Sequence, residues 1–285
     1  MIQKEIKLVG VILRPDTPEL KSGFLMLKEI FEKQGIRVML EARSAEMISQ
    51  SGGKSLQKIC VTCDFIVSFG GDGTLISTVR KSFGYDIPIL GIHAGRLGFL
   101  ADLSLDEFEI FLQKMLRGEY KIEQRSLLEA TVMKNSKVSK MYAFNDIVLT
   151  RKRVSKMIHI ETLVDSKAFN TYYGDGLIVS TPTGSTAYNL SAGGPVLFPM
   201  SNVFALTPIC PHSLKQRPVV LPGRFSLELK TLDDRALIIV DGQDMHELAK
   251  GESLHIRLAQ NTIKLIHKEE YNYFMALKEK LGWGE

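Results

Sequence analysis

The chain has 285 residues, of which 45% are hydrophobic and 24% charged, as in an ordinary globular protein. Single cores stop growing near roughly 250 to 300 residues, so this length fits one large domain or two ordinary ones, and we expect two. The 36 Lys and Arg residues barely outnumber the 32 Asp and Glu residues, and they are scattered along the chain. A nucleic-acid-binding protein gathers its basic residues on one face, so we expect no nucleic-acid partner.

We also expect no membrane contact and no secretion. No apolar stretch approaches the roughly 18 residues of a membrane span. Met1–Leu13 lacks the long apolar region of a secretory signal. Three cysteines argue against a disulfide framework, and Cys60 and Cys63 are interpreted as two core thiols flanking a strand. A redox pair, or a metal site completed by Cys210 and His212, is the less favoured interpretation. These features predict a cytoplasmic protein.

Residues 6 to about 103 alternate short apolar runs with longer amphipathic ones, which predicts alternating strands and helices. Strands are expected at 8–13, 37–41, 65–69 and 88–92, with helices at 18–34 and directly after residue 74. This alternation favours a mainly parallel sheet, whose ligands bind beyond the carboxyl ends of the strands.

After a helix at about 106–117, the pattern changes to short strand-like runs separated by turn residues. The runs lie at 127–133, 141–149, 158–164, 177–180, 225–229, 236–240, 254–258 and 263–266. They predict a β-rich second domain. Residues 269–281 return to helical spacing, and a helix this short should dock on a neighbour, which we expect to be the first domain.

A glycine-rich turn, Gly70-Gly71-Asp72-Gly73-Thr74, joins the third strand to the following helix. Glycines let backbone N–H groups approach a phosphate, and a helix N-terminus favours negative charge. A carboxylate there repels phosphate unless it binds a metal ion or accepts a proton from an attacking hydroxyl, the two acidic tasks in phosphoryl transfer. The alternative is an ordinary turn in which Asp72 caps the helix.

A second polar segment runs from Tyr173 to Gly194. It contains eight Ser, Thr or Tyr hydroxyls and five glycines, which suit a polar ligand better than an apolar core. Tyr188 offers a flat face for a base, and Asp175 offers an acceptor for an amide or amino group. A solvent-exposed loop is the alternative, and this segment alone does not decide between the two.

Two shorter motifs have the composition of ordinary turns. Asn145-Asp146 is a common turn pair, although a vicinal amide and carboxylate also suit the two hydroxyls of a ribose. Asp241-Gly242-Gln243 follows a predicted strand and indicates a hairpin before anything else.

In this order and with this spacing, the four motifs resemble those of the NAD kinase family over nearly the whole chain. The pentapeptide at 70–74 is shared with diacylglycerol and sphingosine kinases, whereas Gly174-Asp175-Gly176 followed by residues 180–188 is similar to NAD kinases alone. Residues 95–100 resemble the family's loop after the fourth strand. The resemblance implies a Rossmann-like α/β domain at 1–122, a β-sandwich domain at 123–266 with NAD bound between the two, and a C-terminal segment, 267–285, that returns to the first domain.

The resemblance also implies roles for individual residues. Asp72 matches the general base that takes the proton from the 2′-hydroxyl of the adenosine ribose. Asn145 and Asp146 match a pair that holds NAD, Asp175 matches an acidic residue that reaches the nicotinamide end across a subunit boundary, and 186–191 match the loop around the adenine. The complete set of implied substrate contacts is Gly73, Phe99, Asn145, Asp146, Lys156, Tyr173, Asp175, Thr183, Thr186, Ala187, Tyr188, Asn189, Leu190, Ser191 and Gln243.

The family's reaction implies ATP as phosphoryl donor, a divalent ion (Mg²⁺ or Mn²⁺) with no side chain assigned as its ligand, and a homodimer or homotetramer. Three positions depart from the family pattern: Asp146 replaces the usual Glu, Tyr173 occupies a place that is often basic, and His93-Ala94 replaces an Asn pair.

Two other functions use some of the same residues. A lipid kinase shares the glycine-rich turn, but it needs an apolar acceptor pocket, and the hydroxyl-rich segment 181–191 is the wrong lining for one. A non-catalytic sensor of NADP(H) would use the same pocket as the kinase.

Overall fold

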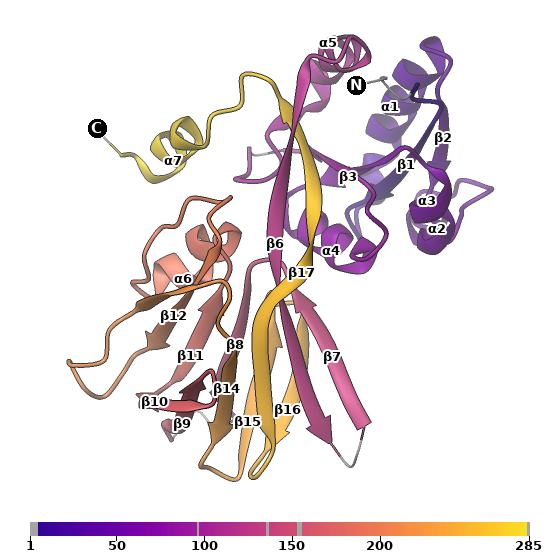
Figure 1. Ribbon diagram of the computed structural model, residues 1–285. Helices are drawn as coiled ribbons and strands as arrows, with labels where there is room; N and C mark the ends of the chain where they lie inside the picture. Colours follow the sequence, from indigo (N-terminus) through magenta and orange to yellow (C-terminus); the bar gives the residue numbers. More distant parts are fainter. Residues whose placement is uncertain (1–4, 96, 135–136, 153–155, 284–285) are drawn as a thin grey trace. The chain divides into compact units, whose positions relative to one another are not determined.

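The computed structural model describes residues 5–95, 97–134, 137–152 and 156–283 (Figure 1). The chain divides into two compact units, unit 1 (Met1–Gln124 and Ile263–Glu285) and unit 2 (Arg125–Thr262). Two long strands, β6 (Tyr120–Lys134) and β17 (Ser253–Lys268), contribute residues to both units.

Unit 1 is built on a parallel sheet. Its strands follow the order β4 (Ile89–His93), β3 (Phe65–Gly70), β1 (Leu8–Leu13) and β2 (Arg37–Leu40), and the end of β17 pairs in parallel with β4. Every residue of β3 is buried, as expected for a central parallel strand covered on both faces. A parallel sheet with its helices was the predicted architecture.

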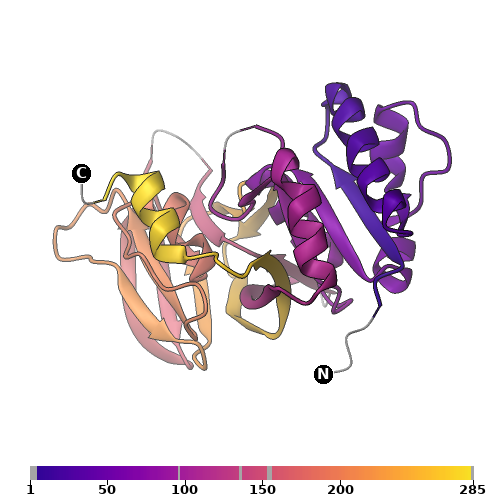
Figure 2. The same ribbon diagram turned by 90° about the horizontal axis from the view of Figure 1, so that it is seen from above.

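Helices cover the two faces of this sheet. On one face, α1 (Lys21–Lys33) and α5 (Leu105–Leu116) share a core with Val9, Val11 and the inward side chains of β3 and β4. Figure 2 shows α5 running alongside the strands. On the other face, a Cβ on Gly10 would lie 2.2 Å from Ile59 of α3 (Leu56–Thr62), so the α3 side chains pack directly on the β1 backbone.

Several boundaries in unit 1 differ from the sequence predictions. The helix expected at 18–34 is a short 3-10 turn, Pro18–Leu20, followed by α1. Both α3 and α2 (Ala42–Met47) were missed, because each is only two turns or less.

Cys60 and Cys63 are buried and free, as expected, but they lie within and just after α3 rather than on both sides of a strand. Burial raises the pKa of the Cys60 thiol to about 11, which makes it a poor nucleophile.

Unit 2 is a sandwich of two sheets. The first sheet is antiparallel, with the order β13 (Val219–Pro222), β12 (Val203–Ile209), β11 (Gly176–Ser180), β8 (Asp146–Arg151), β15 (Arg235–Val240) and β16 (Asp244–Ala249). The second contains β10 (Lys167–Gly174), β9 (Ile158–Val164), β14 (Leu227–Thr231), β17, β6 and β7 (Lys137–Ala143). One core joins the inner faces of both sheets, from Ile147 and Leu149 on β8 to Leu254 and Ile256 on β17.

The β-sandwich was predicted correctly, although its strands were not all found. The run at 141–149 is two strands, because the chain turns at Phe144 and Asn145 between β7 and β8. The runs at 254–258 and 263–266 are parts of the single strand β17. The strands β10, β12, β13 and β16 were not predicted.

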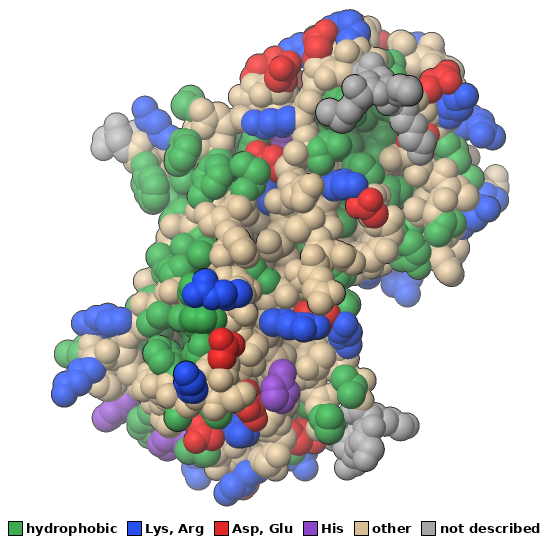
Figure 3. Space-filling model, viewed as in Figure 1, with side chains coloured by type: hydrophobic (Ala, Val, Ile, Leu, Met, Phe, Trp, Pro, Cys, Tyr) green, Lys and Arg blue, Asp and Glu red, His purple; other side chains and the backbone are tan. Residues whose placement is uncertain are grey.

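The C-terminal helix α7 (Tyr273–Leu281) belongs to unit 1 by its contacts. Asn272 caps its N-terminus, and the Lys280 ammonium donates a hydrogen bond to the Leu97 carbonyl oxygen. Phe274 and Met275 are exposed to 66% and 62%, and Figure 3 shows hydrophobic side chains gathered on this segment. None of the helices in the described part of the chain has the length and apolar character of a membrane span.

Candidate active site

The glycine-rich turn lies at the carboxyl end of β3. The strand ends at Gly70, and α4 (Asp72–Ser82) begins two residues later. A Cβ on Gly70 would lie 2.5 Å from the Thr74 hydroxyl and 2.7 Å from the Arg14 Cβ, so the tight turn requires glycine there. A Cβ on Gly71 or Gly73 would meet no described atom within 4 Å, so the space beside these two residues is open.

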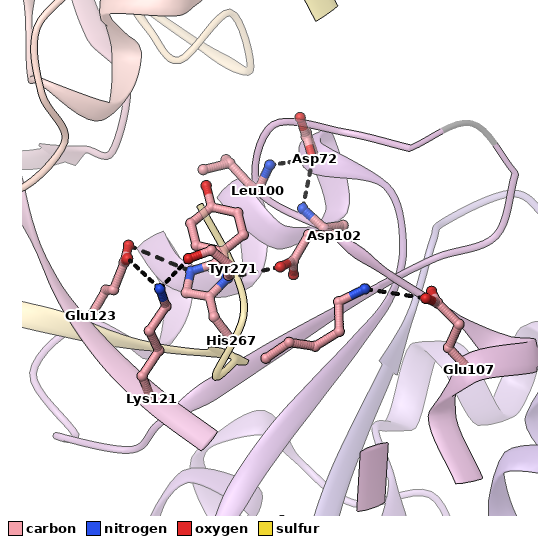
Figure 4. A network of polar contacts seen from close by, with 10 residues as sticks. Asp72, Leu100, Asp102, Glu107, Lys121, Glu123, His267 and Tyr271 are labelled. Atoms are coloured by element: carbon pink, nitrogen blue, oxygen red, sulfur yellow. Dashed lines mark hydrogen bonds and ion pairs between the residues drawn. The ribbon is translucent and has the colours of Figure 1, made fainter. Parts of the chain in front are cut away.

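Asp72 does not cap α4, because Gly71 occupies the N-cap position. Its carboxylate instead accepts hydrogen bonds from the backbone N–H groups of Phe99 (2.8 Å), Leu100 (3.2 Å) and Ala101 (3.0 Å). Figure 4 shows Asp72 beside Leu100 in this arrangement. A Cβ on Gly98 would lie 2.0 Å from a carboxylate oxygen of Asp72, so a larger residue there would displace the carboxylate. The loop after β4 therefore holds Asp72 in one place.

This loop includes the run 95–100, which resembles the NAD kinase family's loop after the fourth strand. Phe99, predicted as a substrate contact, is half-buried, and its backbone N–H is one of the three donors to Asp72. Arg96 lies outside the described residues. Gly73 is exposed at the start of α4, next to Asp72.

In unit 2, the Asn145-Asp146 pair is held by Asp241. The Asp241 carboxylate accepts hydrogen bonds from the backbone N–H groups of Phe144 (2.8 Å), Asn145 (2.7 Å) and Asp146 (3.0 Å). Asp241 itself has a positive φ of 51°, in the hairpin that the sequence predicted. The turn motif at 241 thus positions the motif at 145, a role that the sequence analysis missed because it joins residues far apart in the chain.

Asp146 is buried and Asn145 is half-buried, and described residues leave polar atoms of both side chains without partners. The Asn145 Oδ1 atom has no hydrogen-bond partner in the described structure. Asp146 is only 4% exposed, and no described residue donates a hydrogen bond to its carboxylate. Burial, and secondarily the nearby Asp241 carboxylate, raise the pKa of the Asp146 carboxyl to about 7. Unpaired buried polar atoms are costly, so these two side chains fit a site that a polar ligand completes.

The hydroxyl-rich segment packs against the same pair. The Thr181 hydroxyl donates to the Phe144 carbonyl (2.6 Å), and a Cβ on Gly184 would lie 2.1 Å from the Asn145 carbonyl oxygen. Thr183 is buried, and its hydroxyl lies 3.4 Å from the guanidinium of Arg125 on β6. Arg125 is 1% exposed, and its sequence context gave no signal that set it apart from other basic residues.

The segment from Thr186 to Ser191 divides into exposed and structural residues. Tyr188 is 47% exposed and begins the short helix α6 (Tyr188–Ser191). Thr186, Ala187 and Leu190 are half-buried, and Ser191 is exposed. Asn189 is fully buried; its amide donates to the carbonyls of Ser185 and Pro195 and accepts from the Thr207 hydroxyl. The Asn189 side chain therefore fixes the turn from the inside, whereas Tyr188 and Ser191 beside it are exposed.

Asp175 lies at a crowded bend between β10 and β11. Cβ atoms on Gly174 and Gly176 would lie 2.8 and 2.6 Å from backbone carbonyl oxygens, which explains the glycines on both sides. The Asp175 carboxylate forms an ion pair with Arg151 (2.8 Å). Tyr173 stacks on His159, with 4.1 Å between ring centroids.

Two further predicted contacts, Lys156 and Gln243, are exposed at the surface of unit 2. Lys156 lines a cavity of about 530 Å³ together with Arg151 and residues of the turn before β15. Gln243 is exposed in the hairpin that follows Asp241. Among the described residues, no group of three or more His, Cys, Asp or Glu side chains could hold a metal ion.

The α/β unit carries a glycine turn with a fixed carboxylate, and the β-sandwich carries an amide oxygen without a described partner. These features are typical of a phosphotransferase that acts on a polar substrate. Comparison with family models then gives the family: the ATP-NAD kinase N-terminal domain matches residues 9–120, and the ATP-NAD kinase C-terminal domain matches residues 144–268. The chain belongs to the NAD kinase family and is a kinase that phosphorylates NAD.

Its relatives agree over the full length. The chain is 72% identical to the NAD kinase of Sulfurimonas denitrificans, with 100% of both chains covered, and 43% identical to an NAD kinase of Campylobacter jejuni, covering 99% of this chain and 97% of that one. The crystal structure of yeast NADH kinase complexed with NADH superimposes with a TM-score of 0.89 at 27% identity, covering 99% of this chain and 89% of that one. The crystal structure of an NAD kinase from Archaeoglobus fulgidus in complex with ATP superimposes with a TM-score of 0.78 at 26% identity, covering 96% of this chain and 98% of that one. The lipid-kinase and sensor alternatives are not favoured by these similarities.

Proposed function

We propose that Asp72 is the general base of the reaction and that ATP is the phosphoryl donor. The observation that carries the proposal is the fixed Asp72 carboxylate, held by three backbone N–H groups beside the open glycines Gly71 and Gly73. A base must be held within reach of the proton that it takes, and its position here depends on backbone rather than on a flexible side chain. The ATP complex of the Archaeoglobus fulgidus NAD kinase supports the choice of donor.

In the proposed reaction, the 2′-hydroxyl of the adenosine ribose of NAD gives its proton to Asp72. Its oxygen forms a bond to the γ-phosphorus, the bond from that phosphorus to the β,γ-bridging oxygen breaks, and ADP leaves. The open space beside Gly71 and Gly73 lets their backbone approach phosphate oxygens, and the N-terminus of α4 favours the negative charge.

NAD recognition is assigned to residues of unit 2. Asn145 and Asp146 would pair with ribose hydroxyls, because the buried Asn145 Oδ1 atom has no described partner and no described residue donates a hydrogen bond to the buried Asp146 carboxyl. The exposed ring of Tyr188 would stack on the adenine, with Thr183, Thr186, Ala187, Leu190 and Ser191 around it. Asp175 and Tyr173 would face the nicotinamide end, and Lys156 and Gln243 would add polar contacts at the rim.

A divalent ion, Mg²⁺ or Mn²⁺, fits this chain only as a partner of the phosphates. The described residues offer no cluster of three acidic, His or Cys side chains, whereas Mg²⁺ readily keeps several waters and binds through phosphate oxygens. When bound, the ion would neutralise charge on the transferred phosphoryl group. We assign no side chain as its ligand.

We further propose a cytoplasmic enzyme that works as a homodimer or homotetramer. Free, buried thiols at Cys60 and Cys63 suit a reducing compartment. The outermost strand β16 is exposed over most of its length, and an open strand edge of this kind pairs readily with a second chain.

The direct test is product identification. The purified chain is incubated with Mg²⁺, ATP labelled in its γ-phosphate and NAD, with diacylglycerol as the control acceptor. The proposal requires labelled NADP, its loss when a chelator removes the ion, and no labelled lipid. NADP formed without transfer of the label would rule out ATP as the donor.

A further inference from the structure

A buried group of ionisable side chains lies in unit 1 below the loop that holds Asp72 (Figure 4). At its centre is His267 of β17, which is 1% exposed. Its Nδ1 atom lies 3.3 Å from a carboxylate oxygen of Asp102, and its Nε2 atom lies 3.8 Å from Glu123 of β6. The ring stacks on Tyr271 with 4.3 Å between centroids.

The side chains of this group alternate between acid and base. Asp102 and Glu123 are each about 10% exposed and lie on opposite sides of the imidazole. The Lys121 ammonium lies 4.0 Å from Glu123 and also donates to the Tyr271 carbonyl oxygen. A buried carboxylate is costly unless it is paired, so each acid here depends on a neighbouring base. Among the described residues, His267 is the base that pairs with Asp102, which gives this histidine a specific task.

Asp102 connects the group to the candidate base. It directly follows Ala101, whose N–H is one of the three donors to Asp72. The next two residues form β5 (Leu103–Ser104), which pairs with β4. On the other side of the loop, Lys280 of α7 holds the Leu97 carbonyl. The C-terminal part of the chain therefore supplies a side-chain anchor at each end of the segment 97–102.

We infer that His267 is a positioning residue for phosphoryl transfer: by holding Asp102, it fixes the backbone N–H groups of 99–101 and through them the Asp72 carboxylate. The inference rests on the proposed role of Asp72 as general base. The described contacts of His267 are with Asp102, Glu123 and Tyr271, and none is with Asp72. His267 contributes to turnover by keeping the Asp72 carboxylate in position. Small displacements of a catalytic group lower turnover much more than they weaken binding.

Three variants separate positioning from simple packing. His267→Leu removes both ring nitrogens, whereas His267→Asn places an amide N–H near the position of Nδ1, where it can still donate to Asp102. Lys268→Ala is the matched control, because Lys268 is the next residue of β17 and forms a surface ion pair with Glu107 (3.2 Å). Steady-state kinetics with NAD and ATP, and the urea midpoint of each variant, are measured together.

His267→Leu is expected to lower kcat roughly 10- to 100-fold while the KM for NAD changes less than about twofold. His267→Asn should recover most of the lost kcat, and Lys268→Ala should stay within about twofold of the parent. If His267→Leu does not fold, the isosteric Asp102→Asn tests the same link and should lower kcat roughly fivefold, because the hydrogen bond loses its charged acceptor. The inference would be overturned if His267→Leu raised only the KM for NAD and left kcat unchanged. It would also be overturned if the kcat of His267→Asn were no higher than that of His267→Leu.

The Asp72→Asn background distinguishes this inference from the function on which it rests. If His267 acts through Asp72, His267→Leu should change the residual turnover of Asp72→Asn by less than about twofold, since the two effects are not additive. An equal loss in both backgrounds contradicts the positioning role and leaves the role of Asp72 intact. Full turnover of Asp72→Asn alone would remove both proposals.

Discussion

Asp146 shows how one side chain can report on a site that the protein alone does not complete. It is buried beside a second carboxyl, Asp241, and no described residue donates a hydrogen bond to it. Burial and the neighbouring charge raise its pKa to about 7, compared with an ordinary value of 3.8. The ionised form is therefore unfavourable in the folded protein, and a ligand that donates hydroxyl protons would stabilise it.

Asp146→Asn should stabilise the protein at alkaline pH. The unfolded chain loses this proton at a lower pH than the folded protein, so folding becomes less favourable as the pH rises from about 4 to about 7, and the whole penalty is present above 7. Removing the charge should raise the free energy of unfolding by about 2 to 4 kcal/mol at pH 8.5 and by less than half as much at pH 5.

Urea unfolding at the two pH values measures this difference. Asp16→Asn is a suitable control, because Asp16 is exposed and has a positive φ of 55° that Asn tolerates. If Asp146→Asn raises the free energy of unfolding equally at both pH values, ionised Asp146 does not destabilise the folded protein at alkaline pH.

Asp146→Ala should weaken NAD binding specifically. Two ribose hydroxyls would lose their partner in a buried place, which costs about 1 to 3 kcal/mol of binding. The KM for NAD should therefore rise far more than the KM for ATP, whereas Asp146→Glu, which restores the usual family residue, should be tolerated. Equal changes for both substrates would mean that Asp146 is only a turn residue.

At the scale of elements, the sequence predicted well wherever hydrophobic periodicity was strong. The β3 strand and the amphipathic helices α1 and α5 are buried on the faces that their spacing indicates. It failed for strands whose signal is weak: β16 is mostly exposed and β12 contains Pro208, so neither has the usual pattern of a strand. Periodicity also carries no information about the loop 97–102.

The candidate site was predicted in part for the same reason. Its glycine turn and hydroxyl-rich segment are local motifs, so they are visible in the sequence. The supports of these motifs are not local: Asp241 holds Asn145, and the amides of 99–101 hold Asp72. Such supports depend on tertiary contacts, which a single sequence does not reveal. The substrate roles of the predicted residues stay predictions.

Gly98→Ala should impair catalysis through this loop. A Cβ at this position would lie 2.0 Å from a carboxylate oxygen of Asp72, so either the loop or the carboxylate has to move. We expect kcat to fall roughly 10- to 100-fold with little change in the affinity for NAD. Gly35→Ala is an informative comparison: its Cβ meets no described atom within 4 Å, so only its positive φ of 72° is strained, and kcat should be retained.

In the whole molecule, the outer edge of the first sheet of unit 2 is an exposed strand, β16. Asp244, Met245 and His246 of β16 are all exposed, with Met245 at 63%. On the face seen in Figure 3, positive and negative side chains are interspersed rather than gathered in one basic patch. These features favour association with another protein chain over contact with a polyanion.

The active form is expected to be a homodimer or homotetramer. Sedimentation velocity at the enzyme concentration used in assays should show no major monomer population. Met245→Lys, which adds a charge to the exposed edge, should shift the distribution toward monomer if this edge is the interface. A fully active monomer at assay concentration would contradict the prediction.

The role of Asp72 in taking the proton from NAD is tested most directly by measuring turnover and binding together in Asp72→Asn. The Asn side chain keeps one acceptor oxygen for the amides of 99–101, but it cannot serve as a base. If Asp72 is the general base, kcat should be lower by about 10² to 10⁴, with calorimetric affinity for NAD within about threefold of the parent. Asp106→Asn, an exposed residue in the first turn of α5, should leave both values unchanged. Lost affinity for NAD at unchanged turnover would contradict the claim and make Asp72 a binding residue.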